Sequence, residues 1–295
     1  MGQPTRPLRS GRGCRARDRW ADALDSAAPD DVPPSAVNCK LCGAVDLPLF
    51  FTQGNERQFK YYRCHTCRLV VYDTRDGVNQ EKYILTHVDP RAPTRQNRGH
   101  QQTYAFIKRH MPRPGRMLDL GCGDGTVLWL ARENGWDVKG VELFPEHSQL
   151  VRETLGFDVD TSDIASYNGE EGRWDCVVLT HVLEHLPDPV GALTKIRNLL
   201  KPAGAGVLEF PNIDAFDARL RRVLDQLGIH RHRYAPGYVP GHVQEFCRAS
   251  FAFAAQRAGL VLEVWETYSV NPLQYVFFRT VPVGNKARVL VRRSA

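Results

Sequence analysis

The sequence lacks any long apolar run. No stretch of about 18 hydrophobic residues occurs, which excludes a membrane-spanning helix. The arginine-containing N-terminus has no apolar core segment, so we expect no secretory signal, and its Pro, Arg, Ala and Asp content predicts a disordered leader over residues 1–36. An excess of one charge is also small: the formal net charge is +6, which does not demand a nucleic-acid partner.

A disulfide-like spacing is absent as well. Four of the eight cysteines form two Cys-x-x-Cys pairs, 39-CKLC-42 and 64-CHTC-67, with 21 residues between them (64 − 42 − 1). Two such pairs supply the four thiolates of a closed, tetrahedral structural zinc site, which predicts a zinc ribbon over residues 37–75. The remaining cysteines show no pairing pattern, which favours a reducing, cytoplasmic location. The predicted metal ligands are Cys39, Cys42, Cys64 and Cys67.

Strand and helix patterns alternate from residue 116 onward. Short apolar runs such as 116-RMLDLG-121, 137-DVKGVE-142 and 174-WDCVVLT-180 are separated by helical patterns such as 126-TVLWLARENG-135. This alternation predicts an α/β fold with a doubly wound, mostly parallel sheet covered on both faces.

Two segments complete the expected organisation. Residues 76–113 are polar and predict a helical linker or lid, with 103-TYAFIKRHM-111 as the clearest helical stretch. Residues 114–295 form the α/β domain, and its final strand is predicted either at 275-YVFFRTV-281 or at 287-ARVLVRR-293.

The first strand of this domain ends in a glycine loop, 118-LDLGCGDGT-126. Its three glycines, Gly121, Gly123 and Gly125, allow a tight turn and a close approach of a ligand. The dinucleotide fingerprint would place its third glycine at 126, where threonine stands. The loop also contains aspartates, whose carboxylates suit a cationic ligand better than a pyrophosphate. S-adenosylmethionine, with a sulfonium, an ammonium and no phosphate, is such a ligand.

Acidic residues also follow the next two strands. Glu142 lies 17 residues after Gly125 (142 − 125), where a carboxylate can accept hydrogen bonds from both hydroxyls of a ribose. After the third strand, Asp163 can accept from an adenine amino group while Ile164 packs against the ring. Carboxylates at three successive strand ends therefore favour an adenosine-containing cation.

With these motifs in this order, residues 116–212 resemble the class I S-adenosylmethionine-dependent methyltransferases. The resemblance implies a seven-stranded sheet. It also implies that the loop holds the methionine and ribose, that its first aspartate helps to hold the ammonium group, and that the later residues hold the ribose and adenine. The implied cofactor-binding residues are Asp119, Gly121, Cys122, Gly123, Gly125, Glu142, Asp163 and Ile164.

The stretch 180-THVLEHLPDP-189 matches the zinc-protease signature H-x-x-E-H. Pro187 and Pro189 disfavour the sustained helix that such a protease needs, so we reject that interpretation. The stretch instead resembles the Glu-x-x-Glu-His signature of the ubiquinone-biosynthesis O-methyltransferases and of their relatives that act on small molecules and glycans.

In those relatives the signature serves around a divalent metal or as acid and base groups. Because His181 replaces the first glutamate, a metal at His181, Glu184 and His185 is the weaker alternative, and simple packing is another. A base that deprotonates the acceptor contributes about 10²–10⁴-fold to the rate. We predict that His181 is this base and that Glu184 orients it, with His185 as the second candidate for the base.

A later segment, 241-GHVQEFCRASF-251, resembles the substrate loop of the family, and His242 and Glu245 are predicted to contact the acceptor. The leading interpretation is methylation of a small-molecule or saccharide acceptor, with or without a phosphate group, at a hydroxyl oxygen. Zinc ribbons ahead of this domain resemble those of bacterial sugar and glycan methyltransferases, so C-methylation of a nucleotide-linked sugar is the nearest variant.

Two other interpretations stay open. A zinc-ribbon rRNA base methyltransferase could use the acid-free basic stretch Arg91–Arg116 to bind phosphates, although the expected Asn/Asp-Pro-Pro-aromatic motif is missing. A binding protein that keeps the fold without turnover is the third.

Overall fold

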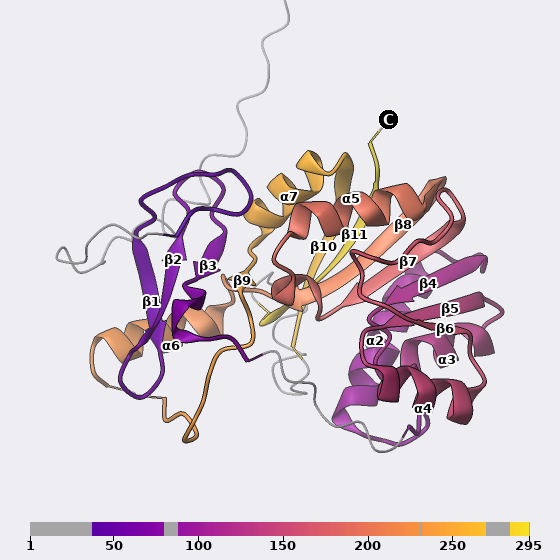
Figure 1. Ribbon diagram of the computed structural model, residues 1–295, viewed down its shortest axis with the longest axis horizontal. Helices are drawn as coiled ribbons and strands as arrows, with labels where there is room; N and C mark the ends of the chain where they lie inside the picture. The colour runs from indigo at the N-terminus through magenta and orange to yellow at the C-terminus, as the bar shows by residue number, and fades with distance from the viewer. Residues whose placement is uncertain (1–36, 80–87, 230–231, 270–283, 295) are drawn as a thin grey trace, which may run out of the picture.

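A computed structural model describes residues 37–79, 88–229, 232–269 and 284–294. These residues form a small sheet, most of it from the N-terminal part of the chain, and a larger α/β unit (Figure 1). The predicted leader over residues 1–36 and the apolar run 275–281 lie outside the described residues. None of the described helices combines the length and hydropathy that a membrane crossing requires.

The larger sheet has seven strands. In spatial order they are β10 (Leu260–Tyr268), β11 (Lys286–Arg293), β8 (Leu200–Pro211), β7 (Trp174–Thr180), β4 (Arg116–Leu120), β5 (Asp137–Glu142) and β6 (Val159–Thr161). Neighbouring strands are parallel except where β11 pairs with β10 and β8. The predicted doubly wound, mostly parallel, seven-stranded sheet is therefore confirmed, and the candidate run 287–293 lies in its last strand.

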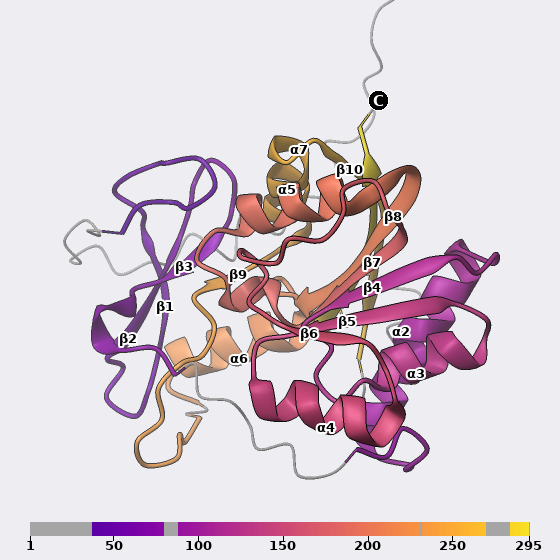
Figure 2. The same ribbon diagram turned by 45° about the vertical axis from the view of Figure 1, so that its right-hand side comes forward.

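Helices cover both faces of this sheet because its strands are apolar on both faces. Met117 of β4 packs into one buried cluster and its neighbour Leu118 into another, as the alternation of side chains along a strand requires. Figure 2 shows α5 and α7 on one side of the sheet and α3 and α4 on the other. The helices are α2 (Arg95–His110), α3 (Thr126–Glu133), α4 (Pro145–Leu155), α5 (Pro189–Leu199), α6 (Phe216–Gln226) and α7 (Arg248–Arg257).

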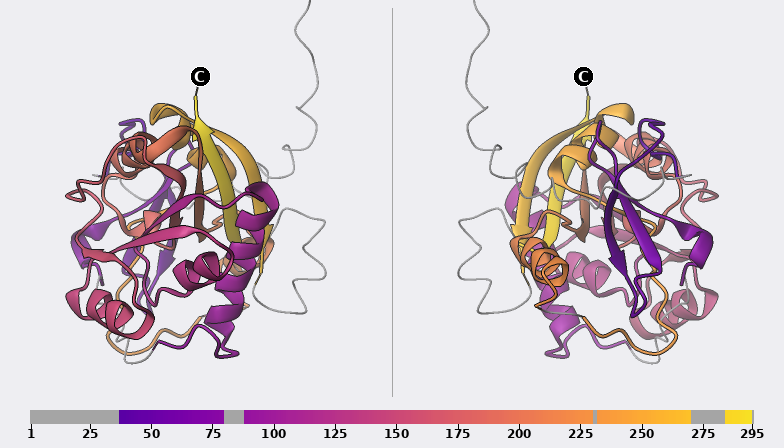
Figure 3. Two further views of the ribbon diagram at one scale, coloured as in Figure 1. Left: turned by 90° about the vertical axis from the view of Figure 1, so that its right-hand side faces the viewer. Right: turned by 90° about the vertical axis from the view of Figure 1, so that its left-hand side faces the viewer.

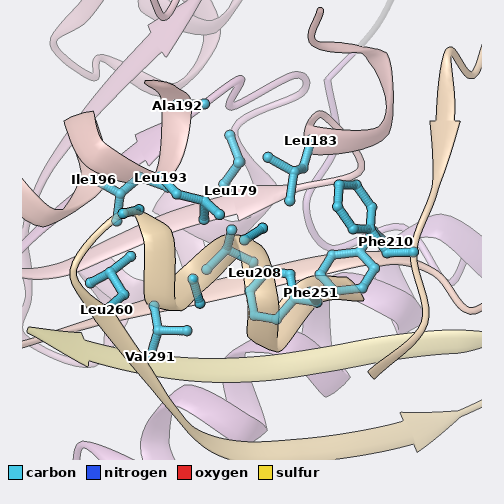
Figure 4. Close-up of a cluster of buried hydrophobic side chains, with 14 of the residues drawn as sticks. Leu179, Leu183, Ala192, Leu193, Ile196, Leu208, Phe210, Phe251, Leu260 and Val291 are labelled. Carbon is cyan, nitrogen blue, oxygen red and sulfur yellow. The ribbon is translucent and has the colours of Figure 1, made fainter. Parts of the chain in front are cut away.

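The core under α5 and α7 is close-packed. Leu193 and Ile196 of α5 meet Leu208 and Phe210 of β8 and Phe251 of α7 in one buried cluster (Figure 4). Burying a side chain of this size contributes about 1.5–3 kcal/mol, so this layer holds the sheet and the turns at its edge in place.

Helix α2 is longer than the predicted stretch 103–111. It begins after Thr94, whose side chain accepts a hydrogen bond from the amide of Asn97 at 3.0 Å. The buried Asn97 side chain also donates to the carbonyls of Asp89 and Ala92, both at 2.8 Å. The first two turns are polar in sequence, so no apolar periodicity revealed them.

The smaller sheet contains strands from two distant parts of the chain. Its order is β1 (Leu49–Gln53), β2 (Phe59–Arg63), β3 (Val70–Tyr72) and β9 (Gln244–Glu245). The first three fall within the segment predicted as a zinc ribbon, whereas β9 comes from the predicted substrate loop. Figure 3 (right) views this sheet with the α/β unit behind it. Cys39 and Leu41 share a buried cluster with Phe246 and Phe251, so the two sheets are packed together.

Two 3-10 turns complete the described elements. The first, η1 (Thr74–Asp76), follows β3, and the second, η2 (Leu183–His185), follows β7 and carries the predicted catalytic residues.

Candidate active site

A cavity of about 840 Å³ lies at the carboxyl ends of the parallel strands. Ligands of open α/β sheets bind at this edge. The cavity is lined by seven of the eight predicted cofactor-binding residues: Asp119, Gly121, Cys122, Gly123, Glu142, Asp163 and Ile164. The eighth, Gly125, caps helix α3 in the left-handed region (φ 70°), and a Cβ there would lie 2.8 Å from Val151 on α4. Gly125 therefore serves the close packing of α3 against α4.

The glycine loop is fixed to the next strand. The amides of Gly121 and Cys122 both donate to the carbonyl of Val141, at 2.7 and 3.0 Å. Gly121 has φ 78°, and a Cβ on it would lie 2.7 Å from a methyl group of Val182. Only glycine combines this backbone conformation with this close approach.

Asp119 carries a buried carboxyl group with an oxygen that lacks a hydrogen-bond donor among the described residues. Its side chain is 2% exposed, and its Oδ1 atom accepts no hydrogen bond from the described residues. Burial, together with the nearby carboxylates of Asp124 and Glu142, raises the pKa of Asp119 to about 8. A cationic group entering the cavity would offset this cost.

Glu142 binds the loop that it faces. Its Oε2 atom accepts from the amide of Gly123 at 2.9 Å, and its Oε1 atom accepts from the amide of Phe144 at 3.1 Å. Each carboxylate oxygen has a second lone pair, so Glu142 can still accept from hydroxyl donors in the cavity.

Asp163 has a local role that the sequence did not reveal. Its carboxylate accepts from the amides of Ala165 (2.6 Å) and Ser166 (3.0 Å) and from the hydroxyl of Ser166 (2.7 Å). The Ser166 hydroxyl is the main reason why the pKa of Asp163 is lowered. Asp163 therefore caps the turn that positions Ile164 at the cavity.

Helix α2 contributes cavity residues that the sequence did not predict. Gln96 donates to Asp124 of the glycine loop at 3.2 Å, and His100 Nδ1 lies 3.6 Å from the same carboxylate. Burial lowers the pKa of His100. These contacts connect α2 to the loop across the cavity, and only the fold brings them together, since about 25 residues separate them in sequence.

His181 follows β7 in the left-handed backbone region, with φ 55°. Such a conformation costs a non-glycine residue about 1–3 kcal/mol, and it occurs mainly at functional positions. The Nδ1 atom lies 3.4 Å from Glu184 Oε1, and the Nε2 atom lies 2.9 Å from the Nζ atom of Lys286. Lys286 comes from β11, and burial lowers its pKa. Nothing near it in sequence marks it as a cavity residue.

A buried ion pair lies beside this group. Glu209 of β8 and Arg288 of β11 are paired, and Glu209 also accepts from the hydroxyls of Thr103 (2.7 Å) and Tyr268 (2.6 Å). Burial would raise the pKa of Glu209, but Arg288 and the hydroxyl donors outweigh it, so the pKa is lowered. Glu209 and Tyr268 line the cavity, and the Glu209–Arg288 pair ties β8 to β11, the strand that carries Lys286.

The metal-like grouping in the structure differs from the set that the sequence offered as the weaker alternative. Glu184, His185 and His242 offer ligand atoms that all lie within 4.8 Å of one another, and His181 is not part of this group. Glu184 is 1% exposed, and its Oε2 atom accepts no hydrogen bond from the described residues. The Nδ1 atom of His242 lies 2.9 Å from Glu245 Oε1. Burial lowers the pKa of His242, but the carboxylate of Glu245 outweighs it and the pKa is raised.

The four predicted zinc ligands come together in the small sheet. The Sγ atoms of Cys39 and Cys67 are 3.3 Å apart, and those of Cys42 and Cys64 are 3.5 Å apart. A disulfide requires about 2.05 Å, whereas two thiolates on one tetrahedral zinc lie about 3.8 Å apart. All four cysteines are unpaired thiols with ligand atoms within 4.8 Å of one another, which fits a zinc site.

Comparison with known proteins identifies the family to which the α/β unit is similar. The family described as "Methyltransferase domain" matches residues 93–264, more than half of the chain. A ubiquinone biosynthesis O-methyltransferase from Ralstonia nicotianae is 30% identical over 167 residues, which cover 52% of this chain and 70% of that relative. One from Cereibacter sphaeroides is 36% identical, but the match spans only 96 residues, or 30% of this chain and 38% of that relative.

Solved structures share the fold. The PH0226 protein from Pyrococcus horikoshii matches with a TM-score of 0.52 at 18% identity, over 71% of this chain and 95% of that chain. An S-adenosylmethionine-dependent methyltransferase from Clostridium acetobutylicum matches with a TM-score of 0.51 at 12% identity, over 66% of this chain and 92% of that chain.

The seven-stranded sheet and the cavity at the carboxyl ends of its parallel strands are those of a class I S-adenosylmethionine-dependent methyltransferase. The chain belongs to the methyltransferase-domain family. The described residues thus contain a Rossmann-like methyltransferase domain, and the cysteine cluster fits a small module beside it.

Proposed function

We propose that the protein transfers a methyl group from S-adenosylmethionine to a hydroxyl oxygen of a small-molecule or saccharide acceptor. The observation that carries the donor assignment is the buried carboxylate of Asp119, which needs a cation and lines the cavity. The names of the ubiquinone O-methyltransferase relatives support a small-molecule hydroxyl as the acceptor.

The donor would bind across the three strand ends. Asp119 would hold its ammonium group, the amides of the glycine loop would line the methionine and ribose, and Glu142 would accept from the ribose hydroxyls. Ile164 would pack against the adenine. The engagement of Asp163 with its own turn supports a positioning role for that carboxylate together with one remaining acceptor site for the adenine amino group.

The acceptor would bind beside His181 and Lys286. The acceptor hydroxyl replaces the Lys286 ammonium as the hydrogen-bond donor to His181 Nε2 and gives its proton to that atom. The oxygen forms a bond to the methyl carbon as the carbon–sulfur bond breaks, and the bonding pair returns to sulfur, which becomes neutral. Glu184 stabilises the protonated imidazole, and Lys286 stabilises the negative charge that develops on oxygen.

Two metal sites are part of the proposal. Zinc at Cys39, Cys42, Cys64 and Cys67 would be structural. A divalent cation would fit Glu184, His185 and His242 better than the predicted set with His181, because Glu184 has an unmatched buried oxygen and Glu245 orients His242 as carboxylates orient metal-bound histidines. Such a cation would supply Lewis-acid polarisation of an acceptor oxygen.

Incubation with methyl-labelled S-adenosylmethionine and fractionated cell extract tests the acceptor class. We expect label in a small-molecule or saccharide fraction. Label in RNA would support the rRNA methyltransferase alternative instead, and tight binding of S-adenosylhomocysteine with no label in any fraction would support a binding protein.

With the acceptor identified, His181→Ala tests the base. We expect kcat to fall by about 10²–10⁴-fold while binding of S-adenosylhomocysteine stays unchanged. His181→Asn separates the loss of the base from backbone strain, because asparagine tolerates the left-handed region well. Unchanged turnover in His181→Ala would show that another group removes the proton.

A further inference from the structure

The small sheet reaches into the α/β unit through β9. Gln244 pairs with Val71 of β3, and Glu245 pairs with Val70, in antiparallel register. The amide of Tyr72 also donates to the carbonyl of Val243 at 3.2 Å. A segment from the predicted substrate loop is therefore the edge strand of the cysteine-bearing sheet.

Gln244 connects this strand to the turn η2. Its side chain is 0% exposed, and its Nε2 atom donates to the carbonyls of Leu183 (3.0 Å) and Leu186 (2.9 Å), one at each end of the turn. The amide of Val243 donates to the carbonyl of Glu184 at 3.0 Å. Three hydrogen bonds from this segment thus hold a turn of three residues that carries two members of the metal-like cluster.

The cysteine cluster is linked to β9 through strands β2 and β3. Cys64 follows β2 directly, and its amide donates to the carbonyl of Leu69, just before β3, at 2.8 Å. The two Cys-x-x-Cys turns have the same backbone form: Gly43 and Arg68, which follow the second cysteine of each, have φ 73° and φ 65°. A metal bound there would fix the β2–β3 hairpin, and β3 is the strand on which β9 pairs.

We propose that Gln244 is a positioning residue, and that the cysteine-bearing sheet acts through it as a brace for Glu184, His185 and His242. His242 precedes β9 by two residues, and Glu245, which contacts His242, belongs to it. The sheet therefore supplies His242 to the turn and fixes the turn in place, while the donor-side loop is held independently by β5. The inference rests on the proposed function only in naming the acceptor side.

The variant Gln244→Met tests the brace. Methionine fills a similar volume but has no donor, so the carbonyls of Leu183 and Leu186 lose the hydrogen bonds that Gln244 donates. Asn55→Ala is the matched control, because the side-chain amide of Asn55 ties the β1–β2 turn to Tyr234, in the segment between α6 and β9, through two hydrogen bonds of 3.0 and 2.9 Å rather than to η2.

Amide hydrogen exchange and calorimetry with S-adenosylhomocysteine provide the readouts. In Gln244→Met we expect exchange at residues 183–186 to rise about tenfold or more, while affinity for S-adenosylhomocysteine changes less than about twofold. In Asn55→Ala the exchange at 183–186 should stay as in the wild type. Equal exchange in both variants, or unchanged exchange in Gln244→Met, would overturn the proposal.

Disrupting the cysteine site alone gives a second test that holds even if Gln244→Met does not fold. Cys39→Ser removes one thiolate from that site and none of the groups at Glu184, His185 and His242, and it should accelerate exchange at residues 183–186 and 242–245 and leave residues 119–125 protected. Exchange that rises equally in all three segments would mean general unfolding and would reject the brace. Neither readout uses an acceptor, so a wrong acceptor assignment does not affect the result.

Discussion

Replacing Asp119 with asparagine removes the buried carboxylate at the donor site, and the effect on stability should depend on pH. Burial raises the pKa of Asp119 from 3.8 to about 8 in the folded protein. Because the folded state then holds the proton more tightly than the unfolded chain, this group costs no stability below about pH 4 and costs progressively more as the pH rises toward 8. One pKa unit corresponds to about 1.4 kcal/mol, so the wild type should lose about 2.7 kcal/mol between pH 5 and pH 7 that the variant does not lose.

Urea unfolding of both proteins without ligand, at pH 5, 6 and 7, measures this difference. The slope of the difference with pH is the informative quantity, because any constant cost of fitting the asparagine amide cancels. Parallel stability curves would refute the reasoning and show that the Asp119 carboxylate has a partner in the folded protein. Calorimetry at pH 7 gives an independent check: loss of a hydrogen bond to a charged group costs about 1.5–3 kcal/mol, so the affinity for S-adenosylmethionine should fall about 10- to 150-fold.

Three further substitutions test other parts of the site. Gly121→Ala should abolish measurable binding of S-adenosylhomocysteine in calorimetry. It should also destabilise the protein more than the control Gly156→Ala, where φ is 68° but the space is open and only about 1–2 kcal/mol of backbone strain is expected. Equal losses of stability in the two variants would contradict the clash with Val182. Cys39→Ser should remove one equivalent of zinc in elemental analysis, whereas Cys176→Ser, buried in β7, should not; retained zinc in Cys39→Ser would exclude the four-cysteine site. Glu209→Gln should lower stability by about 3–5 kcal/mol in urea unfolding, because the buried Arg288 loses its close carboxylate partner and keeps only Glu266 at 3.9 Å. A loss below about 1 kcal/mol would show that water reaches the pair.

The strands and the donor edge of the site were predictable from sequence because each depends on local pattern. The runs 137–142 and 174–180 coincide with β5 and β7, since short apolar segments between glycine and proline signals have few other solutions. The glycine loop and Glu142 lie in the cavity because the end of a parallel strand fixes the position of the residues that follow it.

The acceptor edge was less predictable because it is assembled by strand register. Lys286 reaches His181 only because β11 pairs with β8, and the sequence left two candidates for that strand. The two-residue strand β9 is too short to produce a periodic signal, so the approach of His242 to Glu184 was not foreseen. His181 was predicted as a base oriented by Glu184, and its Nδ1 atom lies 3.4 Å from Glu184, but the contact of its Nε2 atom with Lys286 was not foreseen.

The placement of β11 has a consequence for how the chain folds. This strand lies between β8 and β10, both of which precede it in the chain, and it pairs with eight residues of β10 and seven of β8. Until it inserts, both neighbours expose unpaired backbone edges of the kind that promotes association between chains. A newly made protein would therefore pass through an aggregation-prone intermediate that persists until β11 inserts. Variants that slow this insertion should aggregate during expression even when their folded form is stable.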